Sequence, residues 1–464
     1  MKYGLFADVG STFTKVVAVD LENAEIIGRA MSSTTIATDV NIGYDKAANA
    51  VMDMCGIKEF DLKLACSSAA GGLKMVAIGL VPELTSQAAL LAVQNAGAKV
   101  LASYSFMLSK KEVAEIAGLL PDIILLSGGT NGGNSQVILH NAQALAECPV
   151  PLTVIVAGNK NATDECCEIL EKAGKIAVPC DNVMPEFGVL DIQPAREQIR
   201  KVFLKQIIEA KGLDSLAKRV DGDIIPTPAA VLEAITLLSK GTDKTEGVGS
   251  FVAVDIGGAT TDVYSATEGE CLYQGATLKG LPHPKYKRSV EGDLGMRWSS
   301  PYILEMEGAE KLAKSAGVTE EEVVATIKKF NANPELLPEN EIEQKVDVAV
   351  GKAATRISVK RHSGFITPVY TPLGERFMQE GKDLSAVKYI VGTGGIVISS
   401  PDYKEILSEA MYSVDDMYSL RPKNAEILLD KSYILSAMGL LSTHYPQAAL
   451  HIMKKELEFH GHSE

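Results

Sequence analysis

DIGGATTD, residues 255–262, follows the apolar run FVAV at 251–254 and nearly repeats an earlier stretch, DVGSTFTK at 8–15. The earlier stretch also follows an apolar run, YGLFA at 3–7. In both copies an aspartate ends a strand-like segment, and glycine and hydroxyl residues come next. Glycine permits the backbone angles of tight turns and lets N–H groups approach an anion closely. Each copy therefore predicts a strand that leads into a turn able to hold phosphate.

The segments after each copy predict the same three-strand meander. After the first copy, residues 16–19 and 26–27 are apolar and strand-like, with a polar turn between them. After the second copy, residues 261–265 and 271–274 are expected to form the later strands, with a turn at ATEGE. Short apolar runs bounded by such turn residues are typical of strands. The chain thus repeats an arrangement as well as a motif.

Later in each half, an apolar strand runs into glycines. Residues 389–391 lead into GTGG at 392–395, and residues 123–126 lead into SGGTNGG at 127–133. We interpret these two segments as counterparts. GTGG is then the place where the base or ribose of a nucleotide packs against the backbone, whereas SGGTNGG supports a loop and has no ligand of its own.

Length and pattern together predict the fold class. A chain of 464 residues is too long for one ordinary core, and its continuous apolar runs suit strands covered on both faces, as in α/β folds. We predict two similar α/β domains with mixed five-stranded sheets, residues 1–248 and 249–464, which face a shared nucleotide cleft. The C-terminal helix is free to return to the first domain in this scheme.

Composition excludes several classes of function. The net charge of −14 argues against nucleic-acid partners, and the absence of an apolar run of roughly 18–20 residues argues against a membrane partner. We therefore expect a cytoplasmic protein. The 7 cysteines show no CxxC motif and no histidine at metal spacing, so no metal cluster is predicted. Cys166 lies on an apolar helix face with Ile169 and Leu170, which indicates core packing.

The repeated turns have a shared chemical logic. Mg²⁺ keeps several waters and takes one or two carboxylates together with phosphates, so Asp8 and Asp255 are the predicted catalytic and metal-binding residues, with the metal held through water. Two ordinary hairpin turns are the alternative, because aspartate and glycine are common in turns. The predicted nucleotide-binding residues are Gly10, Ser11, Thr12, Thr14 and Lys15 in the first turn, Gly257, Gly258, Ala259, Thr260 and Thr261 in the second, and Gly392, Thr393, Gly394 and Gly395 in GTGG.

The ordered motifs resemble those of the actin, Hsp70 and sugar-kinase ATPase superfamily. DVGSTFTK and DIGGATTD resemble its two phosphate motifs, and VGTGG at 391–395 resembles its adenosine motif. PTPAAVLEA at 226–234 and SAMGLL at 436–441 resemble its two connecting helices. The resemblance implies a duplicated actin-like (ribonuclease H-like) fold, ATP or ADP with Mg²⁺ as ligands, and Mg²⁺-dependent ATPase activity.

One position departs from the superfamily pattern. Hsp70 proteins carry an acidic residue at the start of the first connecting helix, and Ile225 occupies that place here. Asp223 lies two residues earlier and is not expected to reach the site. The residue that orients the attacking water is therefore left open, and slow hydrolysis is the expected consequence.

Over its whole length the chain resembles the MutL/GlmL family, accessory proteins of adenosylcobalamin-dependent glutamate mutase. FADVGSTFTK at 6–15, LLSGGTNGGN at 125–134 and SVEGDLGMRW at 289–298 carry this resemblance. It implies an ATP-dependent chaperone or reactivating factor whose partners are the subunits of a cobalamin-dependent mutase. Two alternatives stay open: an enzyme that couples ATP to a small substrate, either a kinase or a hydantoinase-type amidohydrolase, and a filament-forming assembly protein.

Overall fold

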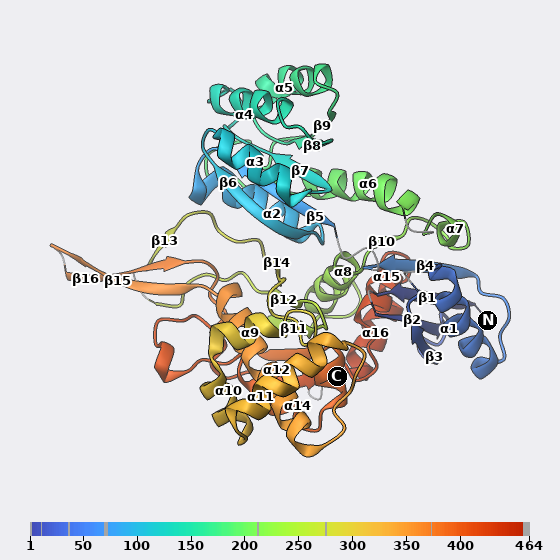
Figure 1. Ribbon diagram of the computed structural model, residues 1–464. Coiled ribbons are helices and arrows are strands. Elements are labelled where there is room, and N and C mark those ends of the chain that lie inside the picture. Colours follow the sequence, from blue (N-terminus) through green and yellow to red (C-terminus); the bar gives the residue numbers. More distant parts are fainter. Residues whose placement is uncertain are drawn as a thin grey trace. The chain divides into compact units, whose positions relative to one another are not determined.

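A computed structural model describes residues 2–10, 12–35, 38–68, 73–210, 213–273, 276–372 and 374–457 (Figure 1). The chain forms two compact units. The first comprises residues 1–234 and 436–449, and the second comprises 235–435 and 450–464. No helix among the described residues is both long and apolar enough to cross a membrane.

The first unit contains the meander predicted after the first aspartate. Three antiparallel strands are followed by two that run parallel to the first. In order across this five-stranded sheet they are β10 (Ile225–Pro226), β4 (Leu62–Ser67), β1 (Tyr3–Val9), β2 (Phe13–Asp20) and β3 (Glu25–Ser33). Helix α1 (Val40–Cys55) packs on β2 and β3 and ends at Gly56, whose positive φ of 71° suits a helix C-terminus.

The second unit repeats this sheet. Its strands, in order, are β18 (Glu426–Leu429), β17 (Tyr389–Thr393), β11 (Phe251–Ile256), β12 (Thr261–Ala266) and β14 (Tyr286–Glu291). The β11–β12–β14 meander is antiparallel, and β17 and β18 run parallel to β11. The order and directions match those of the first sheet strand for strand. The predicted internal duplication and the two mixed five-stranded sheets are confirmed.

A third sheet separates β4 from β10 in the sequence. It is wholly parallel and belongs to the first unit, with the order β6 (Lys99–Ser105), β5 (Lys74–Gly79), β7 (Ile123–Leu126), β8 (Thr153–Val156) and β9 (Ile176–Pro179). This is the order of the flavodoxin-like doubly wound folds. Its connecting helices are α2 (Gln87–Asn95), α3 (Lys110–Leu119), α4 (Gln136–Ala146) and α5 (Lys160–Lys172), with a short π-helix at Pro82–Ser86.

This third sheet corrects the pairing of the two glycine-rich segments. The strand parallel to β11 is β17, and the strand parallel to β1 is β4, not β7. SGGTNGG at 127–133 follows β7, so it is not the structural equivalent of GTGG, and the predicted equivalence is wrong. The equivalent of GTGG in the first unit is the chain directly after β4, and residues 69–72 there lie outside the described part. Sequence pattern did not reveal the inserted sheet because its apolar runs look like any buried strand.

A second correction concerns residues 271–274, predicted as the third strand of the second meander. The described residues 271–273 form no strand, and β14 takes that place. The Leu272 backbone N–H donates to the Asp383 carboxylate at 3.2 Å, and Tyr273 stacks on Phe377. These contacts join the segment to a small sheet of β13 (Thr277–Lys279), β16 (Gly374–Glu380) and β15 (Phe365–Thr371), whose hairpin projects from the second unit in Figure 1.

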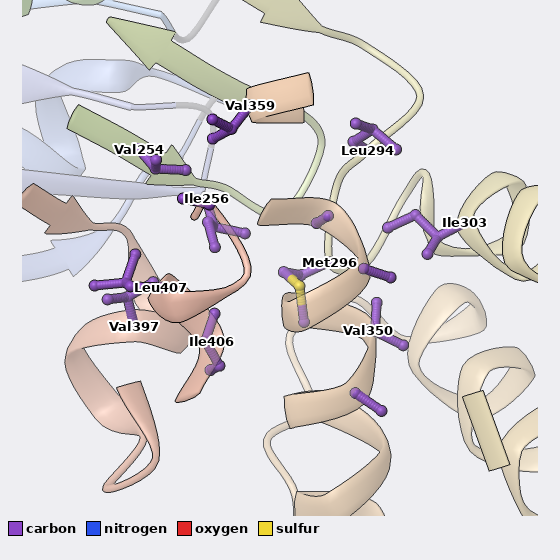
Figure 2. Close-up of a cluster of buried hydrophobic side chains, with 14 of the residues drawn as sticks. Val254, Ile256, Leu294, Met296, Ile303, Val350, Val359, Val397, Ile406 and Leu407 are labelled. Carbon is purple, nitrogen blue, oxygen red and sulfur yellow. The ribbon is translucent and has the colours of Figure 1, made fainter. Parts of the chain in front are cut away.

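Helices cover the second sheet and supply its core. They include α9 (Ser300–Glu307), α10 (Ala309–Ala316), α11 (Glu320–Ala332), α12 (Glu341–His362), α13 (Gly395–Ser399) and α14 (Tyr403–Ser408). A capping box of Thr319 and Glu322 begins α11. Val254 and Ile256 of β11 pack into this core with Met296 and Val350 (Figure 2). Because side chains alternate along a strand, Asp255 between them faces the other side of the sheet.

Five further α-helices complete the described fold. In chain order they are α6 (Gln193–Ala210), α7 (Leu213–Ala217), α8 (Thr227–Lys240), α15 (Leu435–Ser442) and α16 (Pro446–Glu456). α8 and α15 are the two helices predicted to connect the halves. They cross tightly within the first unit, since a Cβ on Gly439 would lie 1.8 Å from the Ala230 carbonyl oxygen.

Candidate functional site: two aspartate turns

The two predicted phosphate turns have the same backbone hydrogen bond. The Gly10 N–H donates to the Phe13 carbonyl at 3.1 Å, and the Gly257 N–H donates to the Thr260 carbonyl at 2.9 Å. Strand register is also identical, since Asp8 lies opposite Lys15 and Asp255 lies opposite Asp262. The sequence repeat is therefore a repeat of conformation.

The first glycine of each turn is needed for close backbone approach. A Cβ on Gly10 would lie 2.7 Å from the Phe13 carbonyl oxygen, and one on Gly257 would lie 3.0 Å from that of Thr260. Real Cβ atoms essentially never come as close as 2.7 Å, so a side chain at Gly10 forces the turn to shift, and one at Gly257 requires a shift of a few tenths of an ångström. The glycines of the motif thus fix the turn shape, as the sequence predicts.

Asp8 is the second-last residue of β1, and hydroxyl groups from distant parts of the first unit hold its carboxylate. Asp8 as a residue is 5 % exposed. Thr227 donates to Oδ1 at 2.6 Å, and Ser436 donates to Oδ2 at 3.3 Å. The Cys66 thiol also approaches Oδ1, at 3.6 Å. Thr227, Ser436 and Cys66 were missed by sequence reasoning, although Thr227 and Ser436 lie in the two segments identified as connecting helices.

Cys66 acts here as a neutral neighbour. Burial and, next, the charge of Asp8 raise the pKa of the Cys66 thiol well above its usual value. A thiol that keeps its proton donates to the carboxylate and adds no second negative charge. Cys66 is therefore a partner of Asp8 and is not an activated nucleophile.

The row of side chains through Asp8 contains no second carboxylate. Across the sheet the row reads Ile225, Cys66, Asp8, Lys15 and Met31. Ile225 is buried, and Asp223 is exposed. The position where Hsp70 proteins carry an acid is thus apolar in the fold as well as in the sequence.

Asp255 has different neighbours in the second unit. It is half-buried and lies between Asp262 of β12 and Thr393 of β17 in strand register. Asp262 is bound by Arg288, whose Nε lies 2.8 Å and Nη2 2.5 Å from Oδ1. The buried guanidinium neutralises Asp262, so Asp255 is not beside an uncompensated negative charge. Asp262 is the last residue of the repeated motif and was not among the predicted site residues.

The hydroxyl groups of the turns divide into two kinds. Thr14 and Thr261 are fully buried, and their hydroxyls bond Thr34 Oγ1 at 2.9 Å and the Leu294 carbonyl at 2.5 Å. Both are thus engaged inside the protein. Thr12 and Thr260 are half-buried, as is Lys15, and Thr260 also donates to Asp262 at 3.3 Å. Ser11 lies outside the described residues.

The segment 289–298, with Ser299 directly after it, donates hydrogen bonds to the backbone carbonyls of the second turn. The N–H groups of Met296 and Arg297 donate to the carbonyls of Gly257 and Gly258, at 3.0 and 2.8 Å. The Ser299 hydroxyl donates to the Ala259 carbonyl at 2.8 Å. With its carbonyls held in this way, the turn keeps one shape, and this gives the SVEGDLGMRW motif a structural role in the site.

Arg297 connects the segment 289–298 to α12. Its guanidinium bonds the Asp347 carboxylate through two nitrogens, at 2.7 and 3.0 Å, and stacks on Phe330. Asp347 is 3 % exposed. A paired, two-pronged contact of this kind fixes orientation as well as charge.

GTGG lies directly against the end of β11. A Cβ on Gly394, whose φ is 100°, would lie 2.4 Å from the Ile256 carbonyl oxygen, so only glycine fits there. Gly392 is packed against Leu407, and Gly395 is exposed. Thr393 donates to the buried Asp430 at 3.2 Å. The structure thus places GTGG next to Asp255 in the second unit.

The residues present suit a magnesium nucleotide better than a dedicated metal site. No group of three or more histidine, cysteine or acidic side chains that could hold a metal occurs among the described residues. Each unit instead offers one aspartate beside a glycine turn whose backbone a Cβ would block. One carboxylate from the protein, with phosphate and water completing the shell, is the usual way Mg²⁺ is held.

Comparisons with known proteins identify the family. The MutL protein family matches residues 4–457. Protein MutL of Clostridium tetanomorphum is 48 % identical over 455 residues, which cover 98 % of both chains.

One similar solved structure is a diol dehydratase-reactivating factor in nucleotide-free form. It is 12 % identical in sequence, the alignment covers 96 % of this chain and 100 % of the reactivating factor, and the TM-score is 0.38. Another is the activator of the 2-hydroxyisocaproyl-CoA dehydratase from Clostridium difficile with bound ADPNP, with 10 % identity, 100 % coverage of both chains and a TM-score of 0.34. Likenesses of this size assign no function. The family match and the near-complete alignment with a relative decide the identity: this chain belongs to the MutL protein family.

Proposed function

We propose that this protein binds ATP and ADP with Mg²⁺, hydrolyses ATP slowly, and serves as a chaperone or reactivating factor of a cobalamin-dependent mutase of the glutamate mutase type. The duplicated aspartate turn carries the nucleotide part of the proposal. Membership in the MutL family, together with the sequence resemblance to glutamate mutase accessory proteins, supports the mutase part.

The residues of each turn have assigned roles in this proposal. Backbone N–H groups of the turns, with Thr12 and Thr260, bind phosphate oxygens, and Lys15 supplies a positive charge beside Asp8. Asp8 and Asp255 bind the waters of Mg²⁺, which when present neutralises phosphate charge. GTGG provides the glycine surface for the base or ribose. Because Ile225 replaces the expected acid, we assign no general base, and hydrolysis without a partner is expected to be slow.

Thermal unfolding tests the nucleotide part. A ligand that binds only the folded state raises its stability by mass action, so millimolar ATP with Mg²⁺ should raise the Tm of the wild-type protein. Asp8→Asn and Asp255→Asn should each remove most of the Mg²⁺-dependent part of the shift. Asp53→Asn, on the exposed face of α1, is the matched control and should behave like wild type. A Tm that Mg·ATP leaves unchanged in the wild type would refute nucleotide binding.

Stimulation of hydrolysis tests the mutase part. ATP hydrolysis should rise when the subunits of adenosylcobalamin-dependent glutamate mutase are added, and should not rise with sugars, organic acids or cyclic amides. Strong stimulation by one of these small molecules would instead favour an ATP-coupled enzyme of the kinase or hydantoinase type. ATP-dependent filaments seen by electron microscopy, without mutase stimulation, would favour an assembly protein.

A further inference from the structure

The carboxylate of Asp8 is bonded to the starts of both connecting helices. Thr227 is the first residue of α8, and Ser436 is the second residue of α15. Their hydroxyls reach Asp8 across 219 and 428 residues of sequence, at 2.6 and 3.3 Å. Hydroxyl residues at helix starts ordinarily cap the backbone N–H groups of their own helix. Here both hydroxyls donate to one predicted Mg²⁺-binding side chain.

The start of α15 has a second anchor, in the second unit. Asp430 accepts the N–H of Ile434 at 3.0 Å and that of Leu435 at 3.3 Å, and it also accepts the Thr393 hydroxyl. Thr393 lies next to Asp255 in strand register. Leu435 is the last residue of its segment in the second unit, and Ser436 resumes the first unit. Ser436 is thus tied to Asp8 within the first unit, and Leu435 is tied within the second unit to Asp430, which also bonds Thr393 of GTGG.

We propose that Thr227 and Ser436 are positioning residues for Asp8. Their hydroxyls hold the carboxylate in the orientation that binds hydrated Mg²⁺, and through them the state of Asp8 is coupled to the first turns of α8 and α15. A carboxylate offers about four lone-pair sites, so two hydroxyl donors fix its orientation and leave sites for metal-bound water. This inference rests on the proposed binding of Mg·nucleotide.

The coupling has a physical basis in the charge of Asp8. A hydrogen bond to a charged acceptor is stronger than one between neutral groups. Water bound to Mg²⁺ would donate to the remaining lone pairs of the Asp8 carboxylate and share its negative charge with the two hydroxyl partners. The bonds from Thr227 and Ser436 therefore differ in strength between the Mg·nucleotide-bound and free states, and the helix starts that carry them respond.

Four variants separate positioning from simple packing. Thr227→Val keeps the shape and removes the hydroxyl, Thr227→Ser restores it, and Ser436→Ala removes the second donor. Ser442→Ala is the matched control, because Ser442 lies in the same helix and its hydroxyl bonds only the Gly439 carbonyl among the described contacts, at 2.6 Å. If Thr227→Val does not fold, Ser436→Ala and Thr227→Ser still test the proposal.

The first readout is the Mg²⁺ concentration that half-saturates the binding of a fluorescent ATP analogue. Thr227→Val and Ser436→Ala should raise this concentration by about tenfold, in line with the loss of a charge-assisted hydrogen bond. Thr227→Ser and Ser442→Ala should stay near the wild-type value. Wild-type Mg²⁺ dependence in both hydroxyl-deletion variants, or an equal change in Ser442→Ala, would overturn the inference.

The second readout is backbone amide hydrogen exchange with and without Mg·ATP. In the wild type, Mg·ATP should change the protection of residues 227–234 and 436–442, and this change should be lost in Thr227→Val and Ser436→Ala. A wild-type protein that binds Mg·ATP without any such change would refute the coupling and leave the proposed function standing. A wild-type protein that binds no Mg·ATP would refute the proposed function, and the coupling with it.

Discussion

At the scale of single residues, the first glycine of each turn has little room for a side chain. Gly257→Ala places a Cβ 3.0 Å from the Thr260 carbonyl oxygen and should distort the turn, so the Tm shift caused by Mg·ATP should fall clearly. Gly118→Ala is the control, because Gly118 lies inside α3 with nothing within 4 Å of its Cβ position. It should leave the ATP response unchanged and raise stability by about 0.5–1 kcal/mol. A full ATP response in Gly257→Ala would show that the turn shape is not needed.

A buried basic cluster in the second unit makes stability depend on pH. His362 is fully buried and bonds Ser289 at 2.7 Å and Ser265 at 2.8 Å, while the Lys287 ammonium group donates to the His362 carbonyl at 2.6 Å. Burial, and next the charge of Lys287, lower the pKa of His362 well below its usual value. Burial also lowers the pKa of Lys287 to about 7.

The lowered pKa values determine how stability changes with pH. Because both groups lose their protons more readily in the folded protein, the unfolded chain binds more protons, and stability falls as the pH falls. The Lys287 contribution to stability falls as pH falls from about 10.5 towards 7, and the His362 contribution falls below about pH 6.5. Urea midpoints measured between pH 8 and pH 5 should therefore decline towards acid. His362→Gln, which retains hydrogen bonding, should decline less steeply over that range. An equal slope in both proteins would contradict the assignment.

At the scale of helices and strands, the crossing of α8 and α15 within the first unit leaves no room for a side chain on Gly439. A Cβ on Gly439 would lie 1.8 Å from the Ala230 carbonyl oxygen. Over-packing of a tight contact typically costs about 1–3 kcal/mol, so Gly439→Ala should lower the free energy of unfolding by at least this amount in urea titrations. The same substitution at Gly118 is expected to be stabilising. A neutral Gly439→Ala would mean that the two helices separate at little cost.

At the scale of the whole molecule, the proposed role makes nucleotide and mutase binding reciprocal. If the nucleotide changes the affinity for the mutase by some factor, the mutase must change the nucleotide affinity by the same factor. Moving a two-state equilibrium from 1:99 to 99:1 takes about 5.5 kcal/mol of differential affinity. Charge-assisted contacts of a γ-phosphate and Mg²⁺ with an aspartate turn are of the right kind to contribute to it.

Binding of the mutase measured with ADP, with a non-hydrolysable ATP analogue and without nucleotide tests this reciprocity. We expect the affinities with ADP and with the ATP analogue to differ, and the mutase to shift the affinity of the favoured nucleotide by the same ratio. Equal mutase affinity in all three conditions would mean that the nucleotide is not the switch.

The sequence by itself determined the features that depend on local chemistry. An aspartate at the end of an apolar strand, followed by glycine, predicted both turns correctly, because their hydrogen bonds span only residues 10–13 and 257–260. The first meander and the duplicated sheet followed from periodicity and turn residues in the same way. Local patterns of this kind are readable because few residues, close in sequence, decide them.

Only the tertiary structure decided which distant residues meet. The position of β4, not β7, beside β1 depends on strand pairing across an inserted sheet, and no local pattern encodes that choice. The same holds for the pairing of Asp262 with Arg288 and for the hydroxyls of Thr227 and Ser436 at Asp8. A serine or threonine at a helix start has the same local sequence signal whether it caps its own helix or bonds a carboxylate, and only the packing of the helix determines which partner its hydroxyl reaches.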